Sequence, residues 1–131
     1  MFQIPSGKIA VMSQLLSFKG RFQWWQYTAS HGQLLLRRNK SAEYPTRIDV
    51  LFKNVAIVQL ATIFDDLEVT EAAVDAVPGV RGQLGALDLS ERKVYLVHGV
   101  NCNGYIVAGS VAWNEDKAEY HEPSKLLLVA E

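Results

Sequence analysis

The hydrophobic pattern of this chain has a period of two that begins after Gly20 and continues through most of the sequence. A period of two indicates β-strands, because successive side chains of a strand point to opposite faces of the sheet. These strands follow one another without regular helices between them, which excludes a doubly wound α/β fold. We predict an α+β, mainly antiparallel β fold: a curved sheet or a small β-sandwich or roll of about seven strands with a short N-terminal helix.

Local sequence signals divide the chain into strands and turns. A hairpin is predicted from residues 21–29 and 33–38, with Gly32 at positive φ in its turn. Asn54 is also expected to adopt positive φ, in a turn between two strands. The other segments are a loop at residues 39–46, a strand at 46–53 with one face in solvent, a strand at 55–64 covered on both faces, strands at 92–99 and 105–113 around a turn at Asn103 and Gly104, and a last strand in the tail from Glu119.

Two short helices are predicted. The first spans Ser6 to Phe18, because Ser6 can cap it and its apolar residues fall at helical spacing. The second would begin at Thr70 and stop at Pro78. The glycine-rich stretch that follows, up to Asp88, is expected to form a loop or a bulged strand.

The composition fits one globular domain over residues 1–131, with 49% hydrophobic and 21% charged residues. Cys102 is the only cysteine, so no internal disulfide can form, which fits a reducing compartment. The N-terminal stretch has no basic lead and its apolar positions are interrupted by polar ones, so we expect neither a signal peptide nor a membrane span. A cytoplasmic location without a membrane partner is the resulting expectation.

Charge is divided unevenly along the chain, although the net charge is only −1. Residues 1–53 carry eight basic and two acidic side chains, and the remaining residues carry five basic and twelve acidic ones. Such a division can mark a basic surface for nucleic acid or an acidic surface for a basic partner. We favour a simpler interpretation, in which basic and acidic strands neutralise one another across the sheet.

The first candidate binding surface is an aromatic and basic hairpin. Strict alternation places Trp24 on one face and Trp25 with Tyr27 on the other, while Arg37 and Arg38 end the partner strand. Aromatic and basic residues interleaved on an antiparallel sheet are typical of single-stranded nucleic-acid binding. Alternatively, the second aromatic face packs under the predicted N-terminal helix or contacts a protein. The slightly negative net charge counts against nucleic acid.

A second candidate surface lies near the C-terminus, where aromatic side chains stand among carboxylates. Such a surface can engage a basic protein partner by charge complementarity. A solvated hairpin tip is the simpler alternative. The residues of this surface are Trp113, Glu115, Asp116, Glu119, Tyr120 and Glu122.

Candidate catalytic residues are few. Cys102 could act as a nucleophile with His98 as its base, but the surrounding sequence matches no cysteine-enzyme motif. His31 and His121 could join these two as metal ligands, but their spacing does not close a metal site. We therefore predict no catalytic residue, no metal and no cofactor.

The carboxylate pair Asp65 and Asp66 is the remaining catalytic candidate, as a hydrolase acid and base. Adjacent side chains on a strand point apart, whereas acid and base carboxylates must converge across a cleft. A solvated turn is the more economical interpretation.

The sequence as a whole favours a non-catalytic protein-interaction domain. A protein partner or a second copy of the chain would contact Trp25 and Tyr27 on one surface and the acidic residues after Trp113 on another. Two alternatives stay open: single-stranded nucleic-acid binding through the hairpin, and a small-molecule-binding or hydrolytic β-domain that uses His98 and Cys102.

Overall fold

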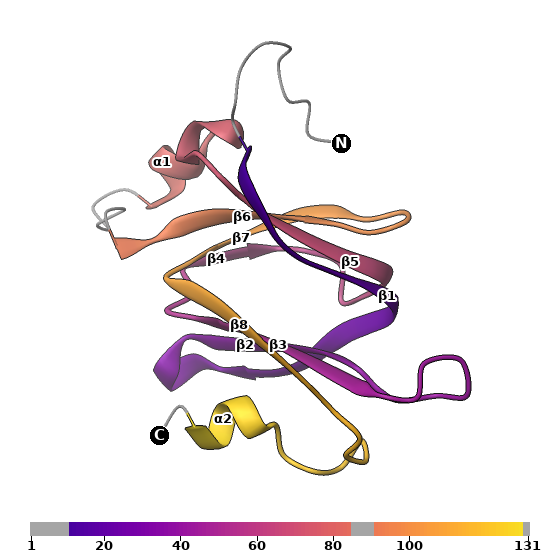
Figure 1. Cartoon of the computed structure of the whole chain (residues 1–131). Coiled ribbons are helices and arrows are strands. Elements are labelled where there is room, and N and C mark those ends of the chain that lie inside the picture. The colour runs from indigo at the N-terminus through magenta and orange to yellow at the C-terminus, as the bar shows by residue number, and fades with distance from the viewer. Residues whose placement is uncertain (1–10, 85–90, 130–131) are drawn as a thin grey trace.

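The computed structural model in Figure 1 describes residues 11–84 and 91–129. Most of the described chain is strand, and none of the described helices is long and apolar enough to cross a membrane. The strands are β1 (Val11–Thr28), β2 (Gln33–Arg38), β3 (Arg47–Lys53), β4 (Ile57–Gln59), β5 (Ile63–Ala72), β6 (Lys93–His98), β7 (Asn103–Ala108) and β8 (Ser110–Asp116). The helices are α1 (Val80–Leu84) and α2 (Lys125–Val129), with 3₁₀ turns η1 (Ala29–His31) and η2 (Val74–Ala76).

The strands pair in one antiparallel sheet of order β4-β7-β6-β5-β1-β2-β3-β8. Figure 1 shows an upper group, β4 to β7, and a lower group, β2, β3 and β8, with β1 running from one group into the other. β1 turns at Gly20, whose φ of 103° strains any other residue, and the Gly20 N–H donates to the Asp66 carboxylate (2.9 Å). β7 continues into β8 through Gly109, which donates to the Lys53 carbonyl (2.8 Å). The sheet therefore curls over itself.

Two apolar cores follow from this curl. The main core fills the space between the two groups and takes side chains from both of them. A smaller core lies on the outer face of the upper group, where η2 and α1 cover β6 and β7. Burial of apolar surface is the main favourable term in folding, so these two cores fix the shape of the sheet. Representative members are Phe22, Leu36, Phe52, Val69 and Ile106 in the main core, and Val77, Val80, Leu96 and Val107 in the smaller one.

The prediction of a mainly antiparallel β fold is confirmed, but the described sheet has eight strands in place of about seven, and the N-terminal helix is wrong. Residues 11–18 belong to β1 and pair with β5, while residues 1–10 lie outside the described chain. The β1–β5 register shifts on either side of Gln14, between Val11 and Ser13 and between Gln14 and Leu16. Each β-bulge adds one residue and changes which face the next side chain occupies. A bulged strand can thus have apolar residues at the spacing of an amphipathic helix. Pairing of this segment with the distant β5 overrides its local helix signal.

The predicted exposures of the next two strands are also wrong. Arg47 and Asp49, expected on a solvent face of β3, are buried. Residues 55–64, expected to be covered on both faces, contain only the short β4 and then the start of β5, where Ile63 is half exposed. Which face of a strand is covered depends on segments far away in the sequence, and alternation alone carries no such information.

Four further local predictions are wrong in the second half of the chain. The helix expected from Thr70 to Pro78 is absent: residues 70–72 belong to β5, and only the 3₁₀ turn η2 follows within this range. The chain is helical later, at α1, where a loop or a bulged strand was expected. Asn103 and Gly104 begin β7, and the turn before it is closed by Gly99 N–H donating to the Cys102 carbonyl (2.7 Å). The tail forms α2 in place of a strand. Residues 85–88 of the predicted loop lie outside the described chain.

Three predictions from local turn chemistry are confirmed, although the equally local turn signal of Asn103 and Gly104 is wrong. β1 and β2 form the expected hairpin, with Gly32 at φ 57°. Asn54 follows β3 at φ 56°. Residues 39–46 form the expected loop between β2 and β3. Glycine and asparagine tolerate positive φ whatever the rest of the fold does, so these signals can be interpreted locally.

The corner of β1 yields a stability prediction. A Cβ on Gly20 would lie 2.6 Å from Arg38 Cδ at a φ that side chains rarely adopt. We expect Gly20→Ala to lower the free energy of unfolding by more than about 1 kcal/mol in urea denaturation. Gly82→Ala, in α1 with open space around it, is the control and should be neutral or stabilising. Equal urea midpoints for the two variants would show that the corner is not tight.

Candidate functional site

A network of buried charges lies on the outer face of β2, β3 and β8. Arg37 and Arg47 are each 1% exposed, and Asp49 lies between them. Arg37 donates to Asp49 through Nε (2.6 Å) and Nη2 (3.2 Å), and Arg47 donates to Asp116 through Nε and Nη2, at 3.1 Å each. The strand register places Arg37 opposite Asp49 and Arg47 opposite Asp116. Pairing of the strands therefore sets both bidentate contacts, and the four charges balance.

The remaining N–H groups of the two arginines hold the C-terminal segment, residues 117–129. Figure 1 places α2, at the end of this segment, against the lower group of strands. Because a buried guanidinium needs all its donors satisfied, these contacts fold the segment onto the outer face that the sequence predicts to be in solvent. The acceptors are the carbonyl oxygens of Glu119, Tyr120, Glu122 and Pro123, at 2.7 to 3.4 Å.

The aromatic residues of the hairpin do not form one surface. The β1–β2 register skips Trp25, which bulges out and is 36% exposed, with the Arg37 guanidinium 4.9 Å from its ring centroid. After this bulge Tyr27 lies opposite Leu34 of the main core, so it shares the face of Trp24. The expected pairing of Trp25 with Tyr27 on one face is therefore wrong, and Trp25 instead shields Arg37 from solvent.

Arg38, the second arginine of the proposed binding hairpin, is also buried. Its Nη1 donates to the Lys19 carbonyl (2.7 Å), and its Nη2 donates to the carbonyl (3.1 Å) and hydroxyl (3.0 Å) of Thr46. Its guanidinium carbon lies 4.7 Å from the centroid of the Tyr44 ring. Both arginines of the hairpin are buried, so the hairpin has no exposed guanidinium with which to contact a nucleic-acid backbone.

The acidic side chains near the C-terminus are engaged within the chain. Glu115 accepts from the Thr46 hydroxyl (2.6 Å), Asp116 pairs with Arg47, and Glu119 pairs with Lys40 (2.6 Å). Tyr120 is exposed, with its ring edge-to-face on His121. The same pattern recurs in the pairs Arg21–Asp65 and Lys19–Asp66. The simpler interpretation of the uneven charge is thus confirmed: basic residues of the first half pair with acidic residues of the second.

One edge of the sheet is open beside Trp113 in the part of the chain that the structure describes. Among the described strands, β8 pairs with β3 on one side only, and β1 before Gln23 pairs only with β5. A cleft of about 330 Å³ lies beside these two strands. Trp113, 48% exposed, lines it and packs edge-to-face on Phe18 with 5.0 Å between ring centroids. The cleft is otherwise lined by the apolar side chains of Leu15, Leu16, Tyr95 and Val111 and by the polar side chains of Glu71, Lys93 and Ser110.

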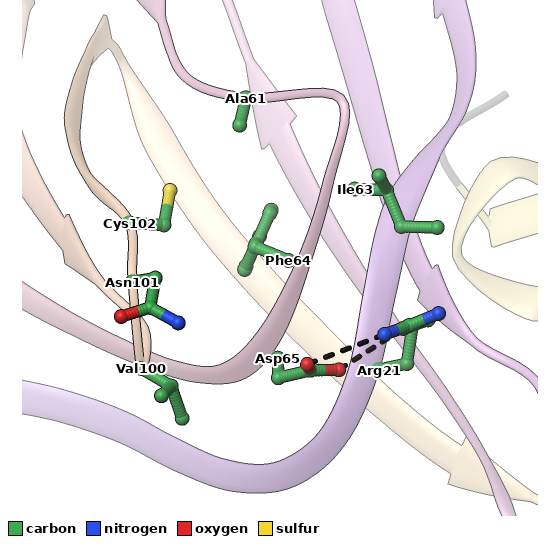
Figure 2. Close-up of a pocket in the computed structure, with 8 residues that line it drawn as sticks. All are labelled: Arg21, Ala61, Ile63, Phe64, Asp65, Val100, Asn101 and Cys102. Carbon is green, nitrogen blue, oxygen red and sulfur yellow. Dashed lines mark hydrogen bonds and ion pairs between the residues drawn. The ribbon is translucent and has the colours of Figure 1, made fainter.

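Cys102 and His98 are not brought together in a pocket. Cys102 lines a pocket of about 230 Å³. Figure 2 shows it on the side of this pocket opposite Arg21 and Asp65. These two side chains form an ion pair (3.0 Å). His98 lines a different hollow, beside Asp66, and its Nδ1 is 2.7 Å from the Asn103 Oδ1. A catalytic thiol needs a base within hydrogen-bond reach, and the described contacts give Cys102 none.

The carboxylates of Asp65 and Asp66 are each paired with a cation. The hydrogen bond from Arg21 lowers the pKa of Asp65, and Asp66 accepts from the Gly20 N–H and pairs with Lys19. A general acid needs a raised pKa, so Asp65 is not poised for acid catalysis. Across the described residues, no group of three or more His, Cys, Asp or Glu side chains could hold a metal ion.

Sequence reasoning missed Arg47 and Asp49, which organise the buried network. The only local signal is that one basic and one acidic residue alternate with apolar residues on the same strand. The acidic residue lies opposite an arginine of the neighbouring strand. A solvated edge strand gives the same pattern, so the signal is not specific. The residues that cover the network come from the C-terminal segment, more than eighty positions after Arg37.

No family model matches the chain, and comparison with curated proteins and with solved structures returned no similar protein. The function must therefore be argued from the geometry of the described residues.

The buried network yields a second stability prediction. Removing one partner of a buried ion pair leaves an uncompensated charge and typically costs about 3–5 kcal/mol, whereas an exposed pair contributes at most about 1 kcal/mol. We expect Arg47→Met to lower the free energy of unfolding by about 3–5 kcal/mol, as measured by urea denaturation. Arg21→Met, which removes the exposed pair with Asp65, is the matched control. Equal losses in the two variants would show that the buried network adds no special stability.

Asp116 yields a pH prediction. Burial alone would raise its pKa, but the Ala118 N–H, Arg47 and Lys125 outweigh burial and hold the pKa below its ordinary value. A carboxylate with a depressed folded-state pKa stabilises the fold at neutral pH, and this stability is lost as the pH falls below about 4. The urea midpoint of the native chain should fall steeply when the pH is lowered from 7 to 5 and then to 3, and the midpoint of Asp116→Asn should fall less steeply. The control Asp75→Asn removes an exposed carboxylate and should show the same dependence of the urea midpoint on pH as the native chain. The same dependence in Asp116→Asn would contradict the lowered pKa of Asp116.

Proposed function

We propose that this chain is a non-catalytic protein-interaction domain that binds an extended segment of a partner protein along the free edge of β8. The observation that carries the proposal is that β8, seven residues long, pairs among the described strands with β3 on one side only and borders a cleft of mixed polar and apolar lining in which Trp113 is half exposed. An unpaired edge strand presents a row of N–H and C=O groups that can pair with another chain.

The mode of binding follows from these parts. An added strand would gain its affinity from main-chain hydrogen bonds to β8, while the cleft would take alternate apolar side chains and supply specificity. Trp113 would contact the partner directly, because large aromatic side chains are preferred anchors in interfaces. The opposite edge of the sheet, β4, has only three residues and offers a much shorter template.

The alternatives have weaker support. Nucleic-acid binding through the hairpin depended on Arg37 and Arg38, and both are buried and hydrogen-bonded to the chain itself. Hydrolysis with Cys102 depended on His98, which lines a separate hollow. A basic partner depended on free carboxylates, yet Asp116 is engaged in a buried ion pair. The open edge of β8 is the feature for which the described chain provides no internal use.

The test is selection of binding peptides from a random library, followed by NMR mapping of a selected peptide on the isotope-labelled chain. We expect amide shifts concentrated along β8 and, in Trp113→Ala, binding weaker by about tenfold or more, because an anchoring aromatic side chain is lost. Trp25→Ala removes an equally large side chain from another surface and should keep the native affinity. A selection that gives no binder, or shifts confined to other strands, would overturn the proposal.

A separate experiment tests whether the chain associates with itself. Sedimentation of the free chain at increasing concentration reports whether a second copy occupies the edge of β8. In that case Val111→Lys should shift the chain toward monomer, because a charge beside an exposed edge opposes strand pairing.

A further inference from the structure

A second open feature lies at the corner of β1, away from the β8 cleft. A pocket of about 510 Å³ is formed there by the turn of β1, by Asp65 and Asp66 of β5, and by the loop of residues 39–46. This volume falls in the usual range of small-molecule sites. Gly20 forms part of its wall, where a Cβ would collide with the stem of Arg38. We call it the corner pocket.

Arg38 is the buried cation of the corner pocket, with 7% of its surface exposed. Arg37 and Arg47 each contact a carboxylate, but among residues 11–84 and 91–129 no carboxylate forms an ion pair with Arg38. Two carbonyl oxygens and the Tyr44 ring contact the guanidinium directly, but the nearest linked carboxylate is the exposed Glu115, which accepts from the Thr46 hydroxyl (2.6 Å). Buried charges in proteins are normally paired, so this guanidinium is under-compensated.

Burial acts on Arg38 in the direction expected for such a charge. Desolvation lowers the pKa of its guanidinium, and Glu115 only partly offsets this effect. An anion placed in the corner pocket would supply the missing counter-charge. Guanidinium groups are well suited to this purpose because they donate several hydrogen bonds in one plane to carboxylate or phosphate oxygens.

Two polar atoms at the pocket also lack partners. In the part of the chain that the structure describes, the Arg38 Nε–H donor and the Asn39 Oδ1 acceptor are buried without a hydrogen bond. Both residues line the corner pocket. A buried polar group without a partner costs about 1–3 kcal/mol, so native proteins rarely leave two side by side. A molecule that satisfied both would have to accept one hydrogen bond and donate another.

The other charges of the pocket are accounted for. Asp65 pairs with Arg21, and Asp66 pairs with Lys19, so neither carboxylate opposes an anion strongly. Glu43 lies exposed at the pocket and has no such cation partner among the described ion pairs. It is the one carboxylate expected to weaken the binding of an anion there.

We infer that the corner pocket binds a small hydroxylated anion, in which an anionic oxygen accepts from Arg38 and a neighbouring hydroxyl donates to Asn39. Carboxylate and phosphate share this chemistry, and hydroxy acids and sugar phosphates are the two sources. The Arg38 Nε and the Asn39 Oδ1 are both buried, so binding requires side chains around them to move, among them the Tyr44 ring, which lies 4.7 Å from the guanidinium carbon of Arg38.

The test is an NMR titration that follows the Arg38 Nε–H and the Asn39 side-chain amide. The probes are malate with succinate, and propane-1,2-diol 1-phosphate with propyl phosphate, and the members of each pair differ by one hydroxyl group. We expect saturable shifts at both reporters below about 10 mM and binding of the hydroxylated member tighter by about fivefold, the value of one hydrogen bond. The preferred pair identifies the source of the anion.

Variants make the test specific to the corner pocket. Asn39→Ala should abolish the preference for the hydroxylated probe, and Glu43→Gln should tighten binding of both members about twofold by removing a nearby like charge. Glu91→Gln, which removes an exposed carboxylate that does not line the pocket, is the control and should change nothing. No shift at Arg38 with any probe, or equal affinity for the members of both pairs, would overturn the inference.

Discussion

The structure depends on two arginines that are buried together on one face of a sheet. Arg37 and Arg47 lie on neighbouring strands with Asp49 between them and Asp116 beside them, so four charges are removed from water at once. Such a cluster is tolerated only if each donor and acceptor is satisfied. The donors that the carboxylates leave over bind carbonyls of the C-terminal segment. This requirement brings the end of the chain onto the lower group of strands.

The same network decides which surfaces remain for function. It engages Arg37 from the hairpin and Asp116 from the acidic stretch, both of which the sequence suggests as binding residues. Trp25 covers Arg37 and is therefore part of the network as well. What remains open is the edge of β8 beside Trp113 and the corner pocket beside Arg38. The cleft beside β8 and the corner pocket share no lining residue, so each can bind a ligand independently of the other.

Sequence reasoning succeeds here where the signal is local. The turn at Gly32, the positive φ of Asn54 and the strong strands β6 and β7 follow from residue types within a few positions. It fails where a distant segment decides. The bulges of β1 can be recognised only against β5, and the buried face of β3 only against the C-terminal segment. For the site, the exposure of Trp113 agrees with the sequence, whereas burial of Arg37 and Arg38 needed the tertiary structure.

The most direct measurement of the central claim is amide hydrogen exchange across the chain in Arg47→Met and in the native protein. If Arg47 holds the C-terminal segment, residues 117–127 should lose protection by about tenfold or more in the variant, beyond any loss in β6 and β7, because a local contact has opened. Arg21→Met, which removes an exposed ion pair, should leave the segment protected. Native protection of residues 117–127 in Arg47→Met, or a uniform loss across all strands, would contradict the claim that the buried arginines fasten this segment.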